Sequence, residues 1–258
     1  MSGRGTVRRL AELTTEEAAS AVQNSPLVII PAGAFEQHGP GMALSTDLVR
    51  AEHVADRVAA EVDGLAVVGP SLPLGVSPHH IGFAGTITLS TTTFAAVVRE
   101  YVDSLHRHGW RRVLVVTGHG GNNASLTTVA QDLLVSHPDL EFAWTPVTAL
   151  AAEAVAGMGV GEVHGHSGEA ETAQMLFLAP HLVHPDRLVA GTTSLAELDP
   201  TARLSRRGGH PTLTLRYDRL SATGVLGDPR RATAADGESI VDAVVRRIAE
   251  FVRAWPTA

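Results

Sequence analysis

The 258-residue sequence contains no cysteine. Disulfide bonds and thiolate metal sites are therefore both excluded. Any metal bound by this chain must be held by oxygen and imidazole ligands. Such ligands suit borderline or hard divalent ions such as zinc, manganese or iron.

Long apolar runs and an excess of positive charge are missing as well. No apolar run approaches the about 20 residues that cross a bilayer. Residues 1–9 carry charge without a following apolar core, so we expect neither a membrane span nor a signal peptide, and a cytoplasmic protein. Twenty basic and 27 acidic residues give a net charge of -7. This balance argues against a nucleic-acid partner, although it does not exclude a small anionic substrate.

Short runs rich in valine and isoleucine alternate with longer amphipathic stretches. Four runs have the length and the continuous apolar character of strands covered on both faces. They are residues 27–30, 65–68, 113–116 and 142–147. Apolar residues at helical spacing mark four longer segments, which are residues 47–62, 91–108, 122–135 and 237–255. The alternation predicts a single α/β domain over residues 1–258, with a mainly parallel sheet and helices on both faces.

The segment 192–233 has a different composition. It is rich in arginine, glycine, proline and threonine and has few long apolar runs. We expect irregular structure here on the same domain, with residues 212–217 as a candidate edge strand.

Polar residues follow the first and third predicted strands. Glu36 and His38 are two residues apart, so an extended backbone points both side chains to one face. Asp47, at the predicted start of the next helix, can return to the same place after a Gly-Pro turn. His119 follows the third strand among glycines, which allow close backbone approach. Because ligands gather at the carboxyl ends of parallel strands, we expect these four side chains to lie together.

A third polar cluster, residues 164–172, leads into another apolar helix. It contains His164, His166, Glu169 and Glu171. Together the clusters offer carboxylates and imidazoles at the ends of different elements. That combination suits a site for two metal ions without thiolates.

A glycine- and proline-rich loop after the second predicted strand carries His79 and His80. It lies at the same edge of the predicted sheet, so we expect these histidines to contact the substrate or the metal ligands. Gly120, Gly121 and Asn122, beside the histidine of the third strand, are expected in the same surroundings.

Each cluster also has a purely structural interpretation. Asp47 is a favoured residue for a helix N-cap, and the glycine-rich loop around His119 could bind an anion at a helix N-terminus. The loop lacks the lysine and the spacing of a P-loop. The rival hypothesis is therefore a non-catalytic anion- or nucleotide-binding module, which explains the glycines but not Glu36, His38 and Asp47 together. Such a module should purify without stoichiometric metal.

The motifs, in this order and spacing, resemble those of the creatininase family of metal-dependent amidohydrolases. The resemblance extends from about residue 26 to the end of the chain. It rests on Glu-Gln-His-Gly-Pro at 36–40 with Asp47, His-Ile-Gly-Phe-Ala-Gly-Thr at 80–86, Gly-His-Gly-Gly-Asn at 118–122, His-Ser-Gly at 166–168 with Glu171 and Thr172, and a late loop at 224–237. It implies a three-layer α/β/α sandwich, a dinuclear metal site and a homo-oligomer, usually a hexamer.

Carried over residue by residue, the resemblance implies that Glu36 and His119 hold one divalent ion, His38 holds the other, and Asp47 bridges them. A water between two such ions loses its proton near neutral pH, because metal binding lowers its pKa from 15.7 to about 7 for zinc. The metal-bridging hydroxide would then attack an amide carbonyl. His166 matches the family's catalytic histidine and is the expected acid for the leaving nitrogen.

Two departures from the family pattern concern the fifth ligand and the substrate. Creatinine-hydrolysing members carry a glutamate ligand two residues after the histidine of the third motif, where this chain has Gly121. We expect Glu171 to supply the missing ligand; Glu169 is the second choice and a further catalytic candidate. Those members also use a tryptophan just before the fourth motif, where Glu162 stands here. Creatinine is therefore not the expected physiological substrate.

Substrates of the family include cyclic amides, formamides from purine-ring opening, and the modified precursor peptide of mycofactocin. The Gly-His-Gly-Gly-Asn form is shared by the deformylase-like and peptidase-like members, so we favour these over creatininase proper. The sequence predicts a hydrolase that cleaves a C–N amide bond of a small molecule or a peptide, with a mycofactocin precursor peptide peptidase as one specific alternative. Fold analogy does not choose among the substrates.

Overall fold

The computed structural model describes residues 7–206, 209 and 211–255. Within these residues one parallel sheet has the strand order β2-β1-β3-β4. Its strands are β1 (Leu27–Ala32), β2 (Ala66–Val68), β3 (Arg112–Thr117) and β4 (Glu141–Pro146). The α-helices are α1 (Thr15–Asn24), α2 (Thr46–Glu61), α3 (Thr91–Arg107), α4 (Asn123–Ser136), α5 (Ala152–Gly157), α6 (Glu169–Leu178), α7 (Pro200–Arg206) and α8 (Ala234–Ala254).

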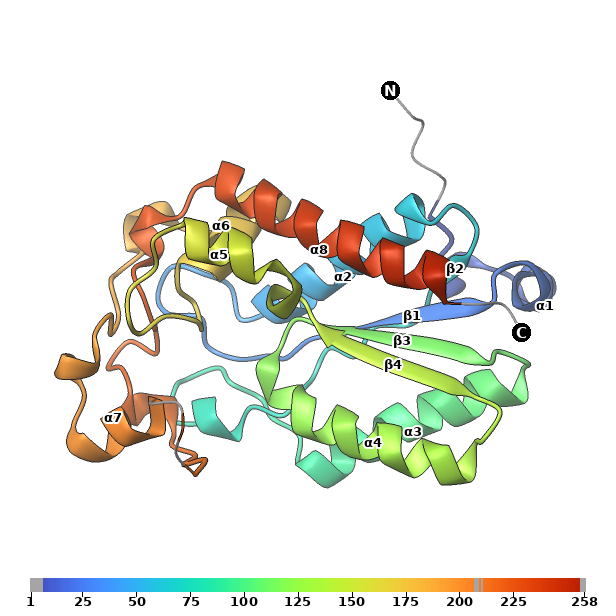
Figure 1. Ribbon diagram of the computed structural model, residues 1–258, viewed down its shortest axis with the longest axis horizontal. Coiled ribbons are helices and arrows are strands. Elements are labelled where there is room, and N and C mark those ends of the chain that lie inside the picture. Colours follow the sequence, from blue (N-terminus) through green and yellow to red (C-terminus); the bar gives the residue numbers. More distant parts are fainter. Residues whose placement is uncertain (1–6, 207–208, 210, 256–258) are drawn as a thin grey trace.

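The sheet separates two apolar cores. In β1, Val28 and Ile30 belong to the core formed with α3 and α4, whereas Leu27 and Ile29 belong to the core formed with α2 and α8. Successive side chains of a strand point to opposite faces, so a strand covered on both faces is apolar along its whole length. Figure 1 shows α2, α5, α6 and α8 over one face of the sheet and α3 and α4 over the other. The predicted α/β/α sandwich is confirmed.

Helix α8 fixes the position of α6, which carries part of the polar cluster at 164–172. The buried face of α8 follows helical spacing from Ile240 to Val252, and each such side chain stabilises the fold by about 1.5–3 kcal/mol. Near its start, Gly237 lies so close to α6 that a Cβ atom there would be 1.9 Å from the Ala173 carbonyl oxygen. Any side chain at this position would push the two helices apart.

The predicted strands and the four predicted helices are confirmed to within a few residues. The edge strand predicted at 212–217 is wrong, because residues 211–216 are irregular and lead into a 3-10 turn at Tyr217–Arg219. Leu213 and Leu215 line a cavity instead of pairing with the sheet. The remainder of 192–233 is irregular, as predicted, apart from α7 and short 3-10 turns; residues 207, 208 and 210 lie outside the described residues.

Among the residues described, no helix combines the length and the apolar character that crossing a membrane requires.

Candidate metal centre

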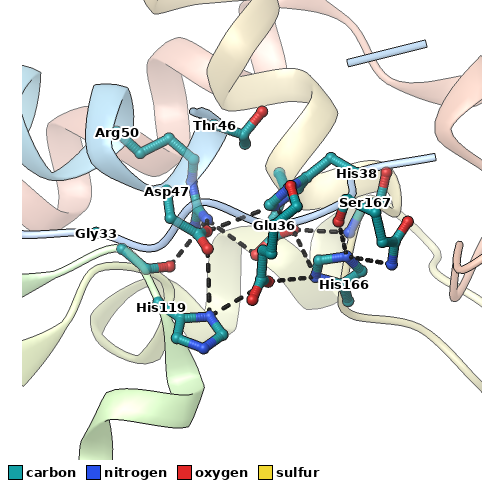
Figure 2. A network of polar contacts seen from close by, with 12 residues as sticks. Gly33, Glu36, His38, Thr46, Asp47, Arg50, His119, His166 and Ser167 are labelled. Atoms are coloured by element: carbon teal, nitrogen blue, oxygen red, sulfur yellow. Dashed lines mark hydrogen bonds and ion pairs between the residues drawn. The ribbon is translucent and has the colours of Figure 1, made fainter. Parts of the chain in front are cut away.

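Five polar side chains converge where the carboxyl ends of the strands meet the N-termini of two helices. Glu36 and His38 follow β1, His119 follows β3, Asp47 lies in the first turn of α2, and Glu171 lies in the first turn of α6. Figure 2 shows Glu36, Asp47 and His119 turned toward one another. The structure therefore brings together all five residues that the sequence analysis named as metal ligands.

In its neutral form, His119 presents one unprotonated ring nitrogen to two carboxylates. Its Nε2 lies 3.0 Å from the Val76 carbonyl oxygen, to which it donates a hydrogen bond. Its Nδ1 is then left without a proton in the neutral ring. That atom lies 3.3 Å from Glu36 Oε1 and 3.2 Å from Asp47 Oδ2. Three electron-pair donors therefore face one point, as a metal site requires.

His38 makes the same arrangement on the other side of Asp47. Its Nδ1 donates to the Glu36 carbonyl oxygen at 3.1 Å, which leaves Nε2 free. Nε2 lies 3.5 Å from Asp47 Oδ1 and 3.6 Å from Glu171 Oε2. The two oxygens of Asp47 thus face two different histidines, which is the geometry of a bridging carboxylate.

The converging atoms lack partners of their own. Both Glu36 oxygens, His38 Nε2 and Asp47 Oδ2 are buried without a hydrogen bond, and the Glu36 and Asp47 residues are 0% and 1% exposed. A buried charge without a partner costs several kcal/mol, so such groups are paired or bind metal. The donor set, carboxylate oxygen and imidazole nitrogen, fits a divalent ion of the zinc or manganese kind.

The pKa shifts of three residues in the cluster reflect the negative charge that Glu36, Asp47 and Glu171 gather there. Burial alone lowers the pKa of His38, but the carboxylates of Asp47, Glu171 and Glu36 outweigh it and raise the pKa to about 9. The pKa of His119 is also raised, because Glu36 and Asp47 overcome the effect of burial. For Asp47, burial raises the pKa, yet His38 and His119 hold it well below its usual value. All three shifts favour a cation at this place.

Arg50 is a buried cation that holds two of the carboxylates, and the sequence analysis missed it. Its Nη1 donates to Glu171 Oε1 at 2.8 Å, to the Gly118 carbonyl oxygen at 3.1 Å and to Asp47 Oδ1 at 3.3 Å. Its Nη2 donates to Thr148 Oγ1 at 2.6 Å, and the residue is 0% exposed. Its position one helical turn after Asp47 indicates a contact with that carboxylate, but it gives no sign of the partners on α6 and in the loop after β4.

His166 lies beside the cluster with its reactive nitrogen fixed by the backbone. Its Nε2 donates to the Gln37 carbonyl oxygen at 2.7 Å, so Nδ1 faces Glu36 Oε1 at 3.4 Å and Glu171 Oε2 at 3.9 Å. Burial, and then the charge of His38, lower the pKa of His166 to about 3. The ring is therefore neutral, and its Nδ1 carries no proton.

Gln37 and His80 support this arrangement. The Gln37 side-chain amide donates from Nε2 to His80 Nδ1 at 2.9 Å and accepts from the Gly39 amide at 2.9 Å. His80 is left with its proton on Nε2, which lies 3.4 Å from Glu36 Oε1. Burial lowers the pKa of His80, so it stays neutral. His79 and His80, neighbours in the loop after β2, both line the cavity above the cluster, but only His80 is buried.

The backbone conformation at Ser167 helps to orient the carboxylate of Glu171. Ser167 has a φ of 56°, which is a left-handed conformation that non-glycine residues rarely adopt. Its amide donates to Glu171 Oε2 at 2.7 Å. Such strain persists only where surrounding structure enforces it, and it is common at functional sites.

Gly121 has no room for a side chain. A Cβ atom there would be 2.2 Å from the Val76 carbonyl oxygen and 2.3 Å from His119 Nε2. The hydrogen bond between these two groups occupies the space. A carboxylate at this position is therefore incompatible with the observed orientation of His119, and Glu171 is the carboxylate that the structure places beside His38.

Two other predicted site residues lie elsewhere. The Glu169 carboxylate is buried against the Gly227 backbone, with both oxygens lacking a hydrogen bond, but it does not line the cavity and belongs to none of the groups of described residues that could hold a metal ion. Asn122 is fully buried and donates to the Gly33 carbonyl oxygen at 3.0 Å while accepting from the Val76 amide at 3.0 Å. It ties three loops together and does not line the cavity.

The cluster, apart from His38, forms the floor of a cavity of about 790 Å³. Glu36, Asp47, His119, Glu171, His79, His80, His166, Gly120 and Gly121 line one side of it. The outer wall consists of residues from α5, the end of α7 and the segment 213–220. Tyr217, which the sequence analysis assigned to a strand, packs its ring 4.2 Å from His80 and 5.4 Å from His166, measured between ring centroids.

Known proteins resemble this chain over most of its length. The creatininase family, described as creatinine amidohydrolase, matches residues 11–252. A mycofactocin precursor peptide peptidase from Mycolicibacterium smegmatis is 35% identical over 236 residues, which cover 89% of this chain and 85% of that protein. A creatinine amidohydrolase from Pseudomonas putida is 28% identical, with 95% of each chain covered. A solved manganese form of creatininase has a TM-score of 0.77 at 25% identity, covering 96% of this chain and 98% of that chain.

These matches agree with the order of motifs and with the three-layer fold. They do not fit the rival hypothesis of a non-catalytic binding module, because the matched relatives are hydrolases of carbon–nitrogen bonds. The predicted amidohydrolase class is confirmed. This chain belongs to the creatininase family.

Proposed function

We propose that this chain is a dinuclear metal-dependent hydrolase that cleaves an amide bond in a peptide. The observation that carries the proposal is the meeting of unpartnered buried atoms from Glu36, His38 and Asp47 at one place. With His119 and Glu171 they divide into two ligand sets that share Asp47. Glu36, Asp47 and His119 would hold one ion, and His38, Asp47 and Glu171 the other.

The metals would be two divalent ions of the zinc, manganese or iron type. The oxygen and imidazole donors suit these ions, and the resemblance to a manganese creatininase supports the choice. When bound, two such ions supply an acidified water and an electrophilic contact for a carbonyl oxygen.

The protein's own residues supply the proton transfer. His166 is neutral, because burial lowers its pKa, and its Nδ1 faces the floor of the cavity. It accepts the proton of the attacking water at Nδ1 and returns it to the leaving nitrogen, which is poorly expelled without that proton. The Gln37 carbonyl oxygen keeps Nε2 protonated throughout and so holds the ring in one orientation.

The cavity supports a substrate larger than creatinine. Its volume of about 790 Å³ lies within the range of pockets that enclose drug-sized ligands. Glu162, at the position where creatinine-hydrolysing members use tryptophan, accepts a hydrogen bond from the Leu195 amide at 2.8 Å and does not line the cavity. The greater identity to a peptidase than to a creatinine amidohydrolase, 35% against 28%, points the same way.

The experiment compares metal content and peptide cleavage in the same preparations. Wild type should hold two ions per chain by elemental analysis. Asp47→Ala should lose both or nearly both, because each ion shares this ligand. Asp132→Ala is the matched control, since Asp132 is an exposed aspartate paired with Arg99, and it should keep both ions.

Substrate choice is tested by offering metal-loaded protein a peptide library and creatinine side by side, with cleavage followed by mass spectrometry. We expect a peptide to be cleaved with kcat/KM of at least ~10⁴ M⁻¹s⁻¹ and creatinine far more slowly. Creatinine turnover at that rate, without peptide cleavage, would refute the substrate proposal. Retention of two tightly bound ions in Asp47→Ala would refute the bridging role. The proposed homo-oligomer, a hexamer by family resemblance, is measured by analytical ultracentrifugation.

A further inference from the structure

Charge is divided unevenly within the cavity. The carboxylates that line it, Glu36, Asp47 and Glu171, belong to the candidate metal centre. The chain contains no lysine, and Arg206 is the one arginine among the described residues that line the cavity. It lies at the end of α7, outside the three layers of the sandwich (Figure 1).

Arg206 has no carboxylate partner. No carboxylate oxygen of the described chain lies within 4.0 Å of its guanidinium, and residues 1–6, 207, 208, 210 and 256–258 include no aspartate or glutamate. Two nearby arginines differ, since Arg216 pairs with Asp218 at 2.7 Å and Arg219 with Asp199 at 3.0 Å. The Arg206 side chain donates from Nη2 to the His164 carbonyl oxygen at 3.1 Å, and it also lies beside the Tyr217 hydroxyl, where its charge opposes the effect of burial that raises the pKa of Tyr217. A carbonyl does not neutralise the charge, and other N–H groups stay available.

An apolar surface accompanies this arginine. Ala152 and Val155 of α5 line the cavity on one side, and Leu213 and Leu215 line it from the irregular segment. Leu213 is 37% exposed, although it lies within reach of a bound molecule. A ligand that fills the cavity therefore meets the candidate metal centre, aliphatic side chains and one guanidinium that has no carboxylate partner among the described residues.

We propose that the amide substrate carries an oxyanion that Arg206 binds, together with an apolar portion that packs on the α5 and 213–215 surface. The proposal rests on the proposed function, because the metal centre fixes where the scissile amide lies. A guanidinium presents a planar fork of donors that matches a carboxylate or a phosphate. A neutral substrate would leave that exposed guanidinium hydrated and without a role in binding.

Hydroxamates test this proposal without requiring turnover. A hydroxamate chelates the metal at one end, and the other end of an alkyl chain carries a carboxylate, a phosphonate or a primary amide, in a series of chain lengths. Calorimetry measures their binding to the metal-loaded wild type and to two variants. Arg206→Gln removes the proposed partner, and Arg216→Gln removes an arginine of the same region that does not line the cavity.

At the best chain length we expect an anionic probe to bind about five- to tenfold more tightly than its amide analogue, as a charge-assisted but partly exposed contact allows. Arg206→Gln should abolish the difference and leave amide binding unchanged, which also shows that the variant is folded. Arg216→Gln should retain it. The preference between carboxylate and phosphonate identifies the kind of oxyanion.

Two outcomes separate this inference from the proposed function. Equal binding of anionic and amide probes to wild type, or a persistent difference in Arg206→Gln, overturns the role of Arg206 while the metal centre stands. Failure of every hydroxamate to bind the metal-loaded protein overturns the proposed metal centre itself.

Discussion

The floor of the cavity and its outer wall are built in different ways. The floor comes from strand ends and the first turns of helices, and four of its five proposed ligands are almost completely buried, as Glu36 at 0% and Asp47 at 1% exposure illustrate. The outer wall comes from short helices and the irregular segment around Leu213, which is 37% exposed. The sheet and its helices thus position the proposed metal ligands, while short helices and an irregular segment form the surface that would contact the rest of the substrate.

This comparison predicts that floor substitutions change rate or metal content, whereas wall substitutions change only substrate binding. The largest effect is expected for His166→Ala. Loss of the group that transfers the proton should lower kcat by about 10²–10⁴-fold while both ions are retained. Turnover and elemental analysis on one sample measure the two quantities.

His164→Ala is the matched control for that variant, because His164 also lines the cavity but is exposed and bonded to the Gly161 carbonyl oxygen. It should keep most of its activity. The loss in His166→Ala should shrink for an amide with an activated leaving amine, which needs less help from a proton. Parallel loss of metal and activity would instead make His166 a ligand.

The next largest effect on activity is expected from a substitution in the glycine-rich loop after β3. Gly121→Ala should lower kcat/KM by about 10²-fold, because its Cβ would displace His119 and misplaced reacting groups cost about that much. Gly120→Ala is the control, since nothing lies within 4 Å of a Cβ at Gly120. Equal effects of the two variants in steady-state assays would show that His119 is not held as described.

Substitutions of the two glutamates at the start of α6 compare a residue of the cavity floor with a nearby residue that does not line the cavity. Glu171→Gln should weaken one metal ion by about 10–100-fold, because Glu171 faces His38 and is held by Arg50. Glu169→Gln should leave metal affinity unchanged, as its carboxylate lies against Gly227. Competition with a chelator measures both. If only Glu169→Gln lost metal, the assignment would be reversed.

The smallest effect is expected from substitution of an apolar residue in the outer wall of the cavity. Leu213→Ala should raise KM by about three- to tenfold, since roughly 1 kcal/mol of apolar contact with substrate is removed, with kcat and metal content unchanged. Leu134→Ala, an exposed leucine on α4 at 75% exposure, provides the control. A loss of metal in Leu213→Ala would mean that wall and floor are not independent.

The same division explains what sequence alone could predict. The strands and the ligands that follow them were predictable, because buried parallel strands are continuous apolar runs and their carboxyl ends meet at one edge. Predicting four of the ligands required no knowledge of packing beyond this rule about strand ends. These ligands are Glu36, His38, Asp47 and His119. Glu171 required the family motif, since its neighbour Glu169 is equally acidic and only the helix geometry turns one of them toward His38.

Residues that act through tertiary contacts were not predictable. Arg50 is one arginine within an amphipathic helix, and nothing in the spacing shows that its partners come from α6 and the loop after β4. Tyr217 and Leu215 alternate with polar residues as a strand would, but their apolar side chains line a cavity instead of a sheet face. Arg206 follows no periodic pattern at all. Irregular segments carry little local signal, because packing partners distant in sequence determine their course.

The most direct test of the central claim is anomalous diffraction from crystals of the metal-loaded protein, recorded at the absorption edges of zinc, manganese and iron. The account predicts two peaks on either side of the Asp47 carboxylate, one next to His119 Nδ1 and the other next to His38 Nε2. A single peak, or a pair of peaks that excludes Asp47, would contradict it.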